Sequence, residues 1–145
     1  MATFGLAVRN PGKIVAFKSQ SAFYDGSACV CGIADTNDAN ILTCALPSGA
    51  SPTTLPLGLI YRDGTTTACT SGDIVEVVLD GIYPCRCGAA GLARGALATP
   101  DGTAGTCMAA APVGGTNCGV LGQVLTLGVS GDMVPINLRP FIYQG

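Results

Sequence analysis

The sequence predicts an all-β fold: a single compact β-sandwich or barrel of short strands, jelly-roll-like, with an extended N-terminal arm. First, apolar residues alternate with period two in the stretch Ser71–Pro84, where Val75, Val77 and Leu79 would form one buried face. Second, glycine-led segments of similar pattern recur at 12–17 and 130–138. Third, no run of about 11 residues or more has the 3.6-residue period of an amphipathic helix. Together these patterns favour many short strands around a β core.

The N-terminal residues predict an arm. Phe4, Leu6 and Val8 alternate with small residues, which is typical of an extended segment with one apolar edge. We expect one β domain over 1–145, with the arm at 1–11 and the β core at 12–145. The arm is either the first core strand or a clasp on a neighbouring subunit, and its small intervening residues favour the clasp.

Further strands and turns follow from local composition. Asp63-Gly64 and Asp80-Gly81 are turn signals of the hairpin type, and the second would fold the strand 71–79 back onto 82–83. The shared pattern predicts that the buried residues of 130–138, Val134 and Leu138, lie beside Val75 and Leu79. Other strands are expected at 28–33, 41–46, 57–62 and 120–125, with a long loop at 47–56.

The composition is apolar and poor in charge. Hydrophobic residues make up 48% of the 145 residues and charged residues 11%, whereas a typical soluble domain has about 25% charged residues. No apolar run approaches the roughly 18 residues of a membrane-spanning helix, so no membrane partner is expected. We expect a soluble chain whose surface is partly covered by other subunits, with a neutral surface rich in small residues as the alternative.

The charges argue against nucleic acid as a direct partner. Seven Lys and Arg residues are spread singly along a chain whose net charge is −2, so no basic patch is expected. The N-terminal residues also lack the charged and apolar regions of a secretory signal. A cleaved signal is therefore not expected.

Eight cysteines are many for this length, and two pairs, Cys29/Cys31 and Cys85/Cys87, have C-x-C spacing. That spacing puts each pair on one strand face and differs from the C-x2-C spacing of structural zinc sites. Without a secretory signal, we expect reduced thiols that pack as small buried hydrophobes. Disulfides and a soft-metal site remain the alternatives.

The residues for catalysis are scarce. The chain has no histidine, which excludes Ser-His-Asp and Cys-His nucleophile systems, and its one glutamate, Glu76, lies in a predicted strand. No phosphate-binding G-x4-G-K-[ST] loop is present. We therefore expect no catalytic residues, no metal site and no cofactor, and hence no enzyme.

The second half of the chain carries a family resemblance. A glycine-led G-D-I-V strand at 72–75 precedes the segment R-G-A-L-A-T-P-D-G-T at 94–103, then V-L-G-Q-V-L at 120–125 and G-D-M-V-P-I-N-L at 131–138. This order resembles the head-decoration, or capsid cement, proteins of tailed bacteriophages. The cysteine content and the loop at 47–56 depart from the usual family pattern.

The resemblance implies a structural virion protein that is made in the host cytoplasm and decorates the outer capsid surface. Its partners would be the major capsid protein, whose subunits it would bridge, and further copies of itself in a trimer or, second, a dimer. Another virion subunit of the head or tail is the first alternative, and a cytosolic β-barrel ligand-binding module or enzyme is the second. Candidate contact residues are apolar residues near the two ends of the chain: Phe4, Leu6, Val8, Phe141 and Tyr143.

Overall fold

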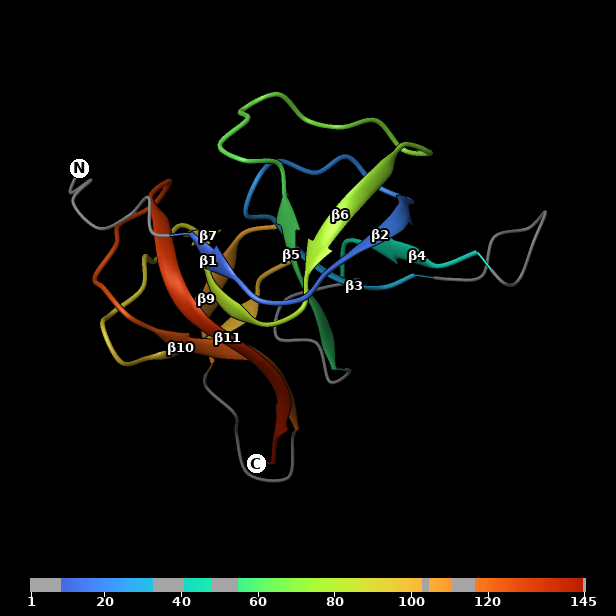
Figure 1. Ribbon diagram of the computed structural model, residues 1–145. Helices are drawn as coiled ribbons and strands as arrows, with labels where there is room; N and C mark the ends of the chain where they lie inside the picture. The colour runs from blue at the N-terminus through green and yellow to red at the C-terminus, as the bar shows by residue number, and fades with distance from the viewer. Residues whose placement is uncertain (1–8, 33–40, 48–54, 103–104, 111–116, 145) are drawn as a thin grey trace.

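The computed structural model describes residues 9–32, 41–47, 55–102, 105–110 and 117–144, and these form eleven β-strands and no helix (Figure 1). The predicted all-β class is therefore confirmed. The arm residues 1–8, and with them Phe4, Leu6 and Val8, lie outside the described residues, as does most of the 47–56 loop. Among the described residues, no helix has the length and hydrophobicity of a membrane span.

The strands from the first half of the chain close into a barrel with the order β2-β4-β3-β5-β6. β2 pairs with β4 in parallel and with β6 antiparallel, and the remaining pairs are antiparallel. Alternation along β6 places Val75 and Val77 in the interior, as the sequence predicted. The barrel strands are β2 (Ile14–Ser19), β3 (Ala28–Cys31), β4 (Thr43–Ala45), β5 (Pro56–Tyr61) and β6 (Ile74–Val78).

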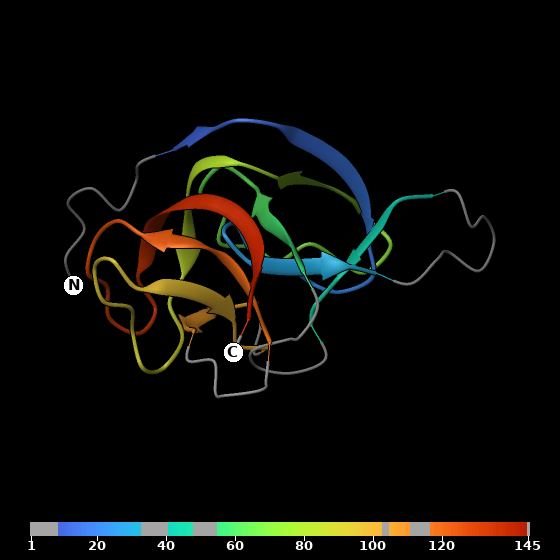
Figure 2. The ribbon, with the colours of Figure 1, turned by 90° about the horizontal axis from the view of Figure 1, so that it is seen from below.

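The strands from the second half, joined by a short N-terminal strand, form an antiparallel sheet with the order β1-β7-β11-β10-β8-β9. Seen from below, this sheet lies beside the barrel, with β11 and β10 as its two central strands (Figure 2). Its strands are β1 (Asn10–Pro11), β7 (Gly81–Arg86), β8 (Leu97–Pro100), β9 (Cys107–Ala109), β10 (Cys118–Val124) and β11 (Met133–Tyr143).

The hairpin predicted at Asp80-Gly81 is wrong, because β6 and β7 belong to different sheets and do not pair. Gly81 has a φ of 95°, and a Cβ there would lie 2.4 Å from the Gly12 nitrogen. The glycine lets the chain leave the barrel, turn and run beside β1. A turn signal does not reveal whether the next strand joins the same sheet, so the sequence could not separate these cases.

Two groups of buried residues fill the molecule. One lies inside the barrel and includes Phe17, Phe23 and Val77. The other joins the barrel to the sheet and combines Leu59 and Val78 of the barrel with residues of β7, β8, β10 and β11. The barrel and the sheet are therefore held together by a shared apolar core.

The two groups are separate, so the prediction that Val134 and Leu138 lie beside Val75 and Leu79 is wrong. Val134 and Leu138 are fully buried, as expected, but they pack between the barrel and the sheet. Val75 belongs to the group inside the barrel instead, and the partly buried Leu79 packs against that group. The similar sequence patterns of β6 and β11 thus mark strands of two different layers.

Candidate interaction surfaces and the polar centre

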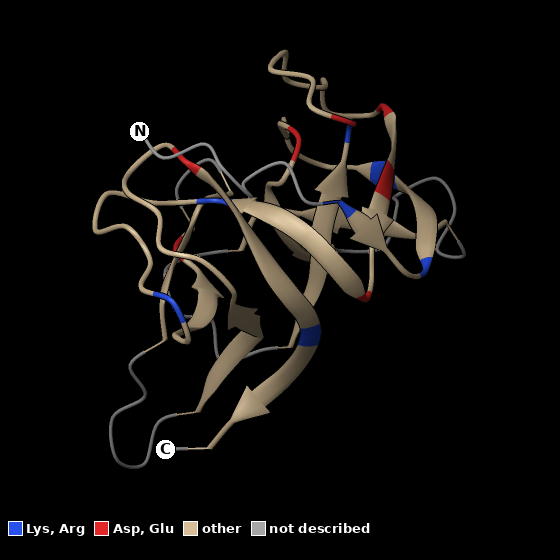
Figure 3. Cartoon of the chain, turned by 60° about the vertical axis from the view of Figure 1, so that its left-hand side comes forward, with Lys and Arg blue, Asp and Glu red and all other residues tan. Residues whose placement is uncertain are grey.

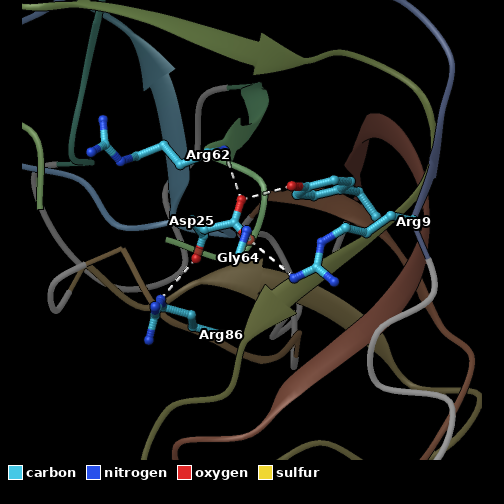
Figure 4. A network of polar contacts seen from close by, with 6 residues as sticks. Arg9, Asp25, Arg62, Gly64 and Arg86 are labelled. Carbon is cyan, nitrogen blue, oxygen red and sulfur yellow. Dashed lines mark hydrogen bonds and ion pairs between the residues drawn. The ribbon is translucent and has the colours of Figure 1, made fainter. Parts of the chain in front are cut away.

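Asp25 is the centre of a buried polar network that joins three parts of the chain (Figure 4). Its carboxylate accepts hydrogen bonds from the Tyr83 hydroxyl and the Arg62 backbone N–H, both at 2.7 Å, and from the Gly64 N–H at 2.8 Å. The Arg9 guanidinium donates to it at 3.2 Å. Since Asp25 is only 1% exposed, these donors replace water around its charge.

The network sets the protonation of its members. Burial alone would raise the pKa of Asp25, but the hydrogen bonds from Tyr83, Arg62, Gly64 and Arg9 outweigh it and hold the pKa below its ordinary value. Burial and the hydrogen bond to Asp25 raise the pKa of Tyr83. Asp25 is therefore ionised and Tyr83 neutral at physiological pH.

Cation–π contacts extend this centre. The Arg86 Nε donates to the Asp25 backbone oxygen at 2.8 Å, and its guanidinium lies 4.9 Å from the Tyr24 ring centroid. The Arg9 guanidinium lies 5.7 Å from the centroid of Tyr83. Arg9 directly follows the residues outside the described part, so the network fixes the point where the arm joins the body.

No periodic pattern could have revealed this network. Asp25 lies in a turn-rich segment, and its partners are 16 to 61 residues away in the sequence. The local sequence Tyr24-Asp25-Gly26 indicates a turn, but it does not identify the partners of Asp25. The network stabilises the fold.

The predicted contact residues Phe141 and Tyr143 lie at the C-terminal end of β11. Each is 40% exposed, although each is aromatic. Among the described residues, this end of β11 pairs with β10 alone, because its pairs with β7 end at Leu138 (Figure 1). The two strands thus form a ribbon that extends beyond the rest of the sheet.

A bulge bends this ribbon. Val120 pairs with Phe141 and Gly122 with Leu138, so Arg139 and Pro140 together lie opposite Leu121. A bulge is one of the few positions inside a sheet that tolerates proline. Gly122 allows a close approach, since a Cβ there would lie 2.0 Å from the Asn137 oxygen.

An open groove of about 520 Å³ lies on the sheet beside the bulge. Arg139 is the one charged residue in the sequences of β10 and β11, and charges are sparse over this part of the molecule (Figure 3). The surface is therefore suited to apolar and hydrogen-bonding contacts. Its lining residues are Leu97, Gly122, Gln123, Asn137, Arg139, Pro140 and Phe141.

Sequence reasoning missed a second apolar surface at the other end of β10 and β11. Leu127 is 65% exposed and Val129 is 55% exposed, beside the alanine-rich turn 89–93. Leu92 and Gly128 form a bridge that holds the two turns together. Apolar residues inside the glycine turn that precedes β11 were the signal that could have identified this surface.

The cysteines pack as the sequence predicted. Seven of the eight are buried and Cys31 is exposed, and all eight lie in the described part of the chain. Burial raises the pKa of Cys87 to about 12. No group of three or more potential metal ligands occurs among the described residues.

Comparisons with known proteins identify a shared fold. No protein-family model matches the sequence, and no curated protein matches it either. The structure is similar to the crystal structure of the N base of the head fiber protein gp8.5 of bacteriophage phi29, with a TM-score of 0.58 and 14% sequence identity. The match covers 88% of this chain and 93% of the other. At this identity, the similarity establishes the fold.

Proposed function

We propose that the protein is a structural component of a tailed-bacteriophage head, which binds the outer capsid surface and stabilises it by bridging major capsid subunits. The observation that carries the proposal is the fold similarity to a phage head fiber base, which spans nearly all of both chains. The sequence resemblance to head-decoration proteins supports it independently, because it rests on the order of motifs and not on the fold.

The surface of the molecule supports a binding role. Half-exposed Phe141 and Tyr143 and the neighbouring groove form a surface with a single charge, Arg139. Aromatic residues and arginine are enriched at protein interfaces, where most other charged residues are depleted. The major capsid protein is the proposed partner of this surface.

The proposed function is mechanical and does not involve catalysis. The chain has no histidine, and its one glutamate, Glu76, is an exposed residue of β6. A homo-oligomer, with a trimer favoured over a dimer, would present several copies of the binding surface. Several weak contacts made together give an avidity that a single contact lacks.

Co-sedimentation with capsids tests the proposal. Capsids assembled from the major capsid protein encoded in the same genome are mixed with the purified chain before and after shell expansion. We expect the chain to sediment with expanded capsids at a fixed ratio and to raise their disruption temperature. If the folded chain stays in the supernatant with both capsid forms, the proposal is wrong.

A second candidate function is to attach a head fiber to the capsid. It is favoured by one observation, namely that the similar structure is the base of such a fiber. A mount would occupy few positions on the shell and would bind a fiber-forming chain, whereas a decoration protein would cover the shell at high copy number. The ratio of bound chains to capsid subunits therefore separates the two functions.

A further inference from the structure

Cys31 and Cys44 are directly opposite each other on neighbouring antiparallel strands of the barrel. Cys31 is the last residue of β3, and Cys44 is the middle residue of β4. Residues that face each other across an antiparallel pair project from the same side of the sheet. The two thiols therefore share one face.

The backbone hydrogen bonds show which kind of pair this is. The Gly32 N–H donates to the Thr43 carbonyl at 3.0 Å, whereas the Cys44 carbonyl accepts from the Gln20 N–H at 2.8 Å. The Cys44 carbonyl thus points to β2, and the bond between β3 and β4 joins the flanking residues Gly32 and Thr43, so Cys31 and Cys44 form a non-hydrogen-bonded pair. Such pairs have Cα atoms about 4.5 Å apart, which lies within the disulfide range of about 4.4–6.8 Å.

The two thiols differ in accessibility and reactivity. Cys31 is exposed and donates to its neighbouring Gly32 carbonyl at 3.7 Å, whereas Cys44 is fully buried. A hydrogen bond from the Cys29 thiol lowers the pKa of the Cys44 thiol although burial acts to raise it. A soluble oxidant can therefore reach Cys31 directly, and the buried Cys44 opposite it is placed to act as the internal nucleophile.

We propose that Cys31 and Cys44 form an intramolecular disulfide when the protein meets a low-molecular-weight disulfide such as oxidised glutathione. The Cys31 sulfur attacks the oxidant, forms a mixed disulfide and releases one reduced thiol. After rotation of the Cys31 side chain, the Cys44 sulfur attacks the Cys31 sulfur and releases the second thiol. The two cysteines are oxidised, the oxidant is reduced to two thiols, and both cysteine protons pass to these thiols.

The disulfide would close a ring that contains residues 32–43 and tie β3 to β4 at one end of the barrel. Cross-links of this kind stabilise mainly by restricting the unfolded chain. The other close thiols are Cys29, which is hydrogen-bonded to Cys44, and the group of Cys85, Cys87 and Cys107, and all of them are buried and out of reach of the oxidant. This proposal is independent of the proposed function.

Peptide mapping of the native protein after treatment with oxidised glutathione tests it. We expect an intact mass lower by two hydrogen atoms, a cross-linked peptide that joins Cys31 to Cys44, and a higher melting temperature. Reduction should reverse all three changes. A stable glutathione adduct on Cys31, a cross-linked dimer or an unmodified wild-type protein would each overturn the proposal.

Three variants test which cysteine acts in each of the two steps. Cys44→Ala should stop at the mixed disulfide on Cys31, and Cys31→Ser should not react. Cys118→Ala, which replaces a buried cysteine elsewhere, should still form the disulfide. Because the wild-type peptide map decides the question alone, a folding defect in Cys44→Ala would leave the test intact.

Discussion

Asp25 is stable as a buried anion because four donors from three parts of the chain surround it. Tyr83 is held by β7, and the Arg62 and Gly64 N–H groups are held by the turn that follows β5. The same contacts make the residue sensitive to substitution. An amide at this position would place its own N–H groups against backbone N–H groups and a guanidinium.

We expect Asp25→Asn to lower the free energy of unfolding by about 2–3 kcal/mol, the range for lost hydrogen bonds to a charged group. Urea denaturation at neutral pH measures this change. Asp63→Asn, which replaces an exposed aspartate nearby, is the matched control and should have little effect. Equal losses in both variants would contradict a special role for Asp25.

The stabilisation that Asp25 provides should depend on pH, and the Asp25→Asn variant tests this. The pKa of Asp25 is lower in the folded protein than in the unfolded chain, so its contribution to stability is complete above about pH 5. It is lost as the pH falls below the ordinary carboxyl pKa of about 3.9 and through the lower folded value. The stability difference between wild type and Asp25→Asn should therefore shrink in acid, and a constant difference would contradict the lowered pKa.

Substitution of Leu138 tests the apolar core between the barrel and the sheet. It is fully buried, so Leu138→Ala should cost about 2–5 kcal/mol in urea denaturation. Leu127→Ala makes the same substitution at a leucine that is 65% exposed, and it should change stability by less than about 0.5 kcal/mol. Similar losses in both variants would show that Leu138 does not anchor the core.

At the scale of elements, the β10–β11 ribbon is the proposed contact with the capsid. We expect the double variant Phe141→Ala, Tyr143→Ala to keep its melting temperature within a few degrees and to bind capsids at least about 10-fold more weakly, since buried aromatic residues dominate interface energies. Ile74→Ala, at an apolar residue of the barrel that is 69% exposed, is the control and should bind normally. Unchanged binding by the double variant would show that the ribbon is not part of the interface.

The N-terminal arm has its own test. Deletion of residues 1–8 leaves Arg9 and the Asp25 network in place. If the arm clasps a neighbour, the truncated protein should melt as the full chain does but stabilise capsids poorly, as calorimetry of both would show. A large drop in the melting temperature of the isolated protein would identify the arm as a core strand instead.

The elements show how far the sequence could predict the structure. Period-two alternation located β6 and the similar glycine-led strands β2 and β11, and local composition located β3, β4, β5 and β10. It could not show that the chain changes layer at Gly81, since a glycine turn fits a hairpin and a crossing equally well. The Asp25 network depends on contacts between distant segments, which no local pattern encodes.

The whole molecule joins a closed barrel and an open sheet through one apolar core. β10 and β11 contribute to that core, but the end of β11 with Phe141 and Tyr143 extends beyond it, where it can contact a partner without disturbing the fold. A low charge density over the chain suits a protein that is covered by neighbours for most of its life. These properties agree with a mechanical role on a capsid.

Electron cryo-microscopy of capsids assembled with and without the chain tests the central claim most directly. The account predicts additional density on the outer surface of the shell, into which the barrel and the sheet fit with the β10–β11 ribbon against the major capsid protein. Density at positions of local threefold symmetry would also support the trimer. Capsids that carry no added density, or that carry it only inside the shell, would contradict the account.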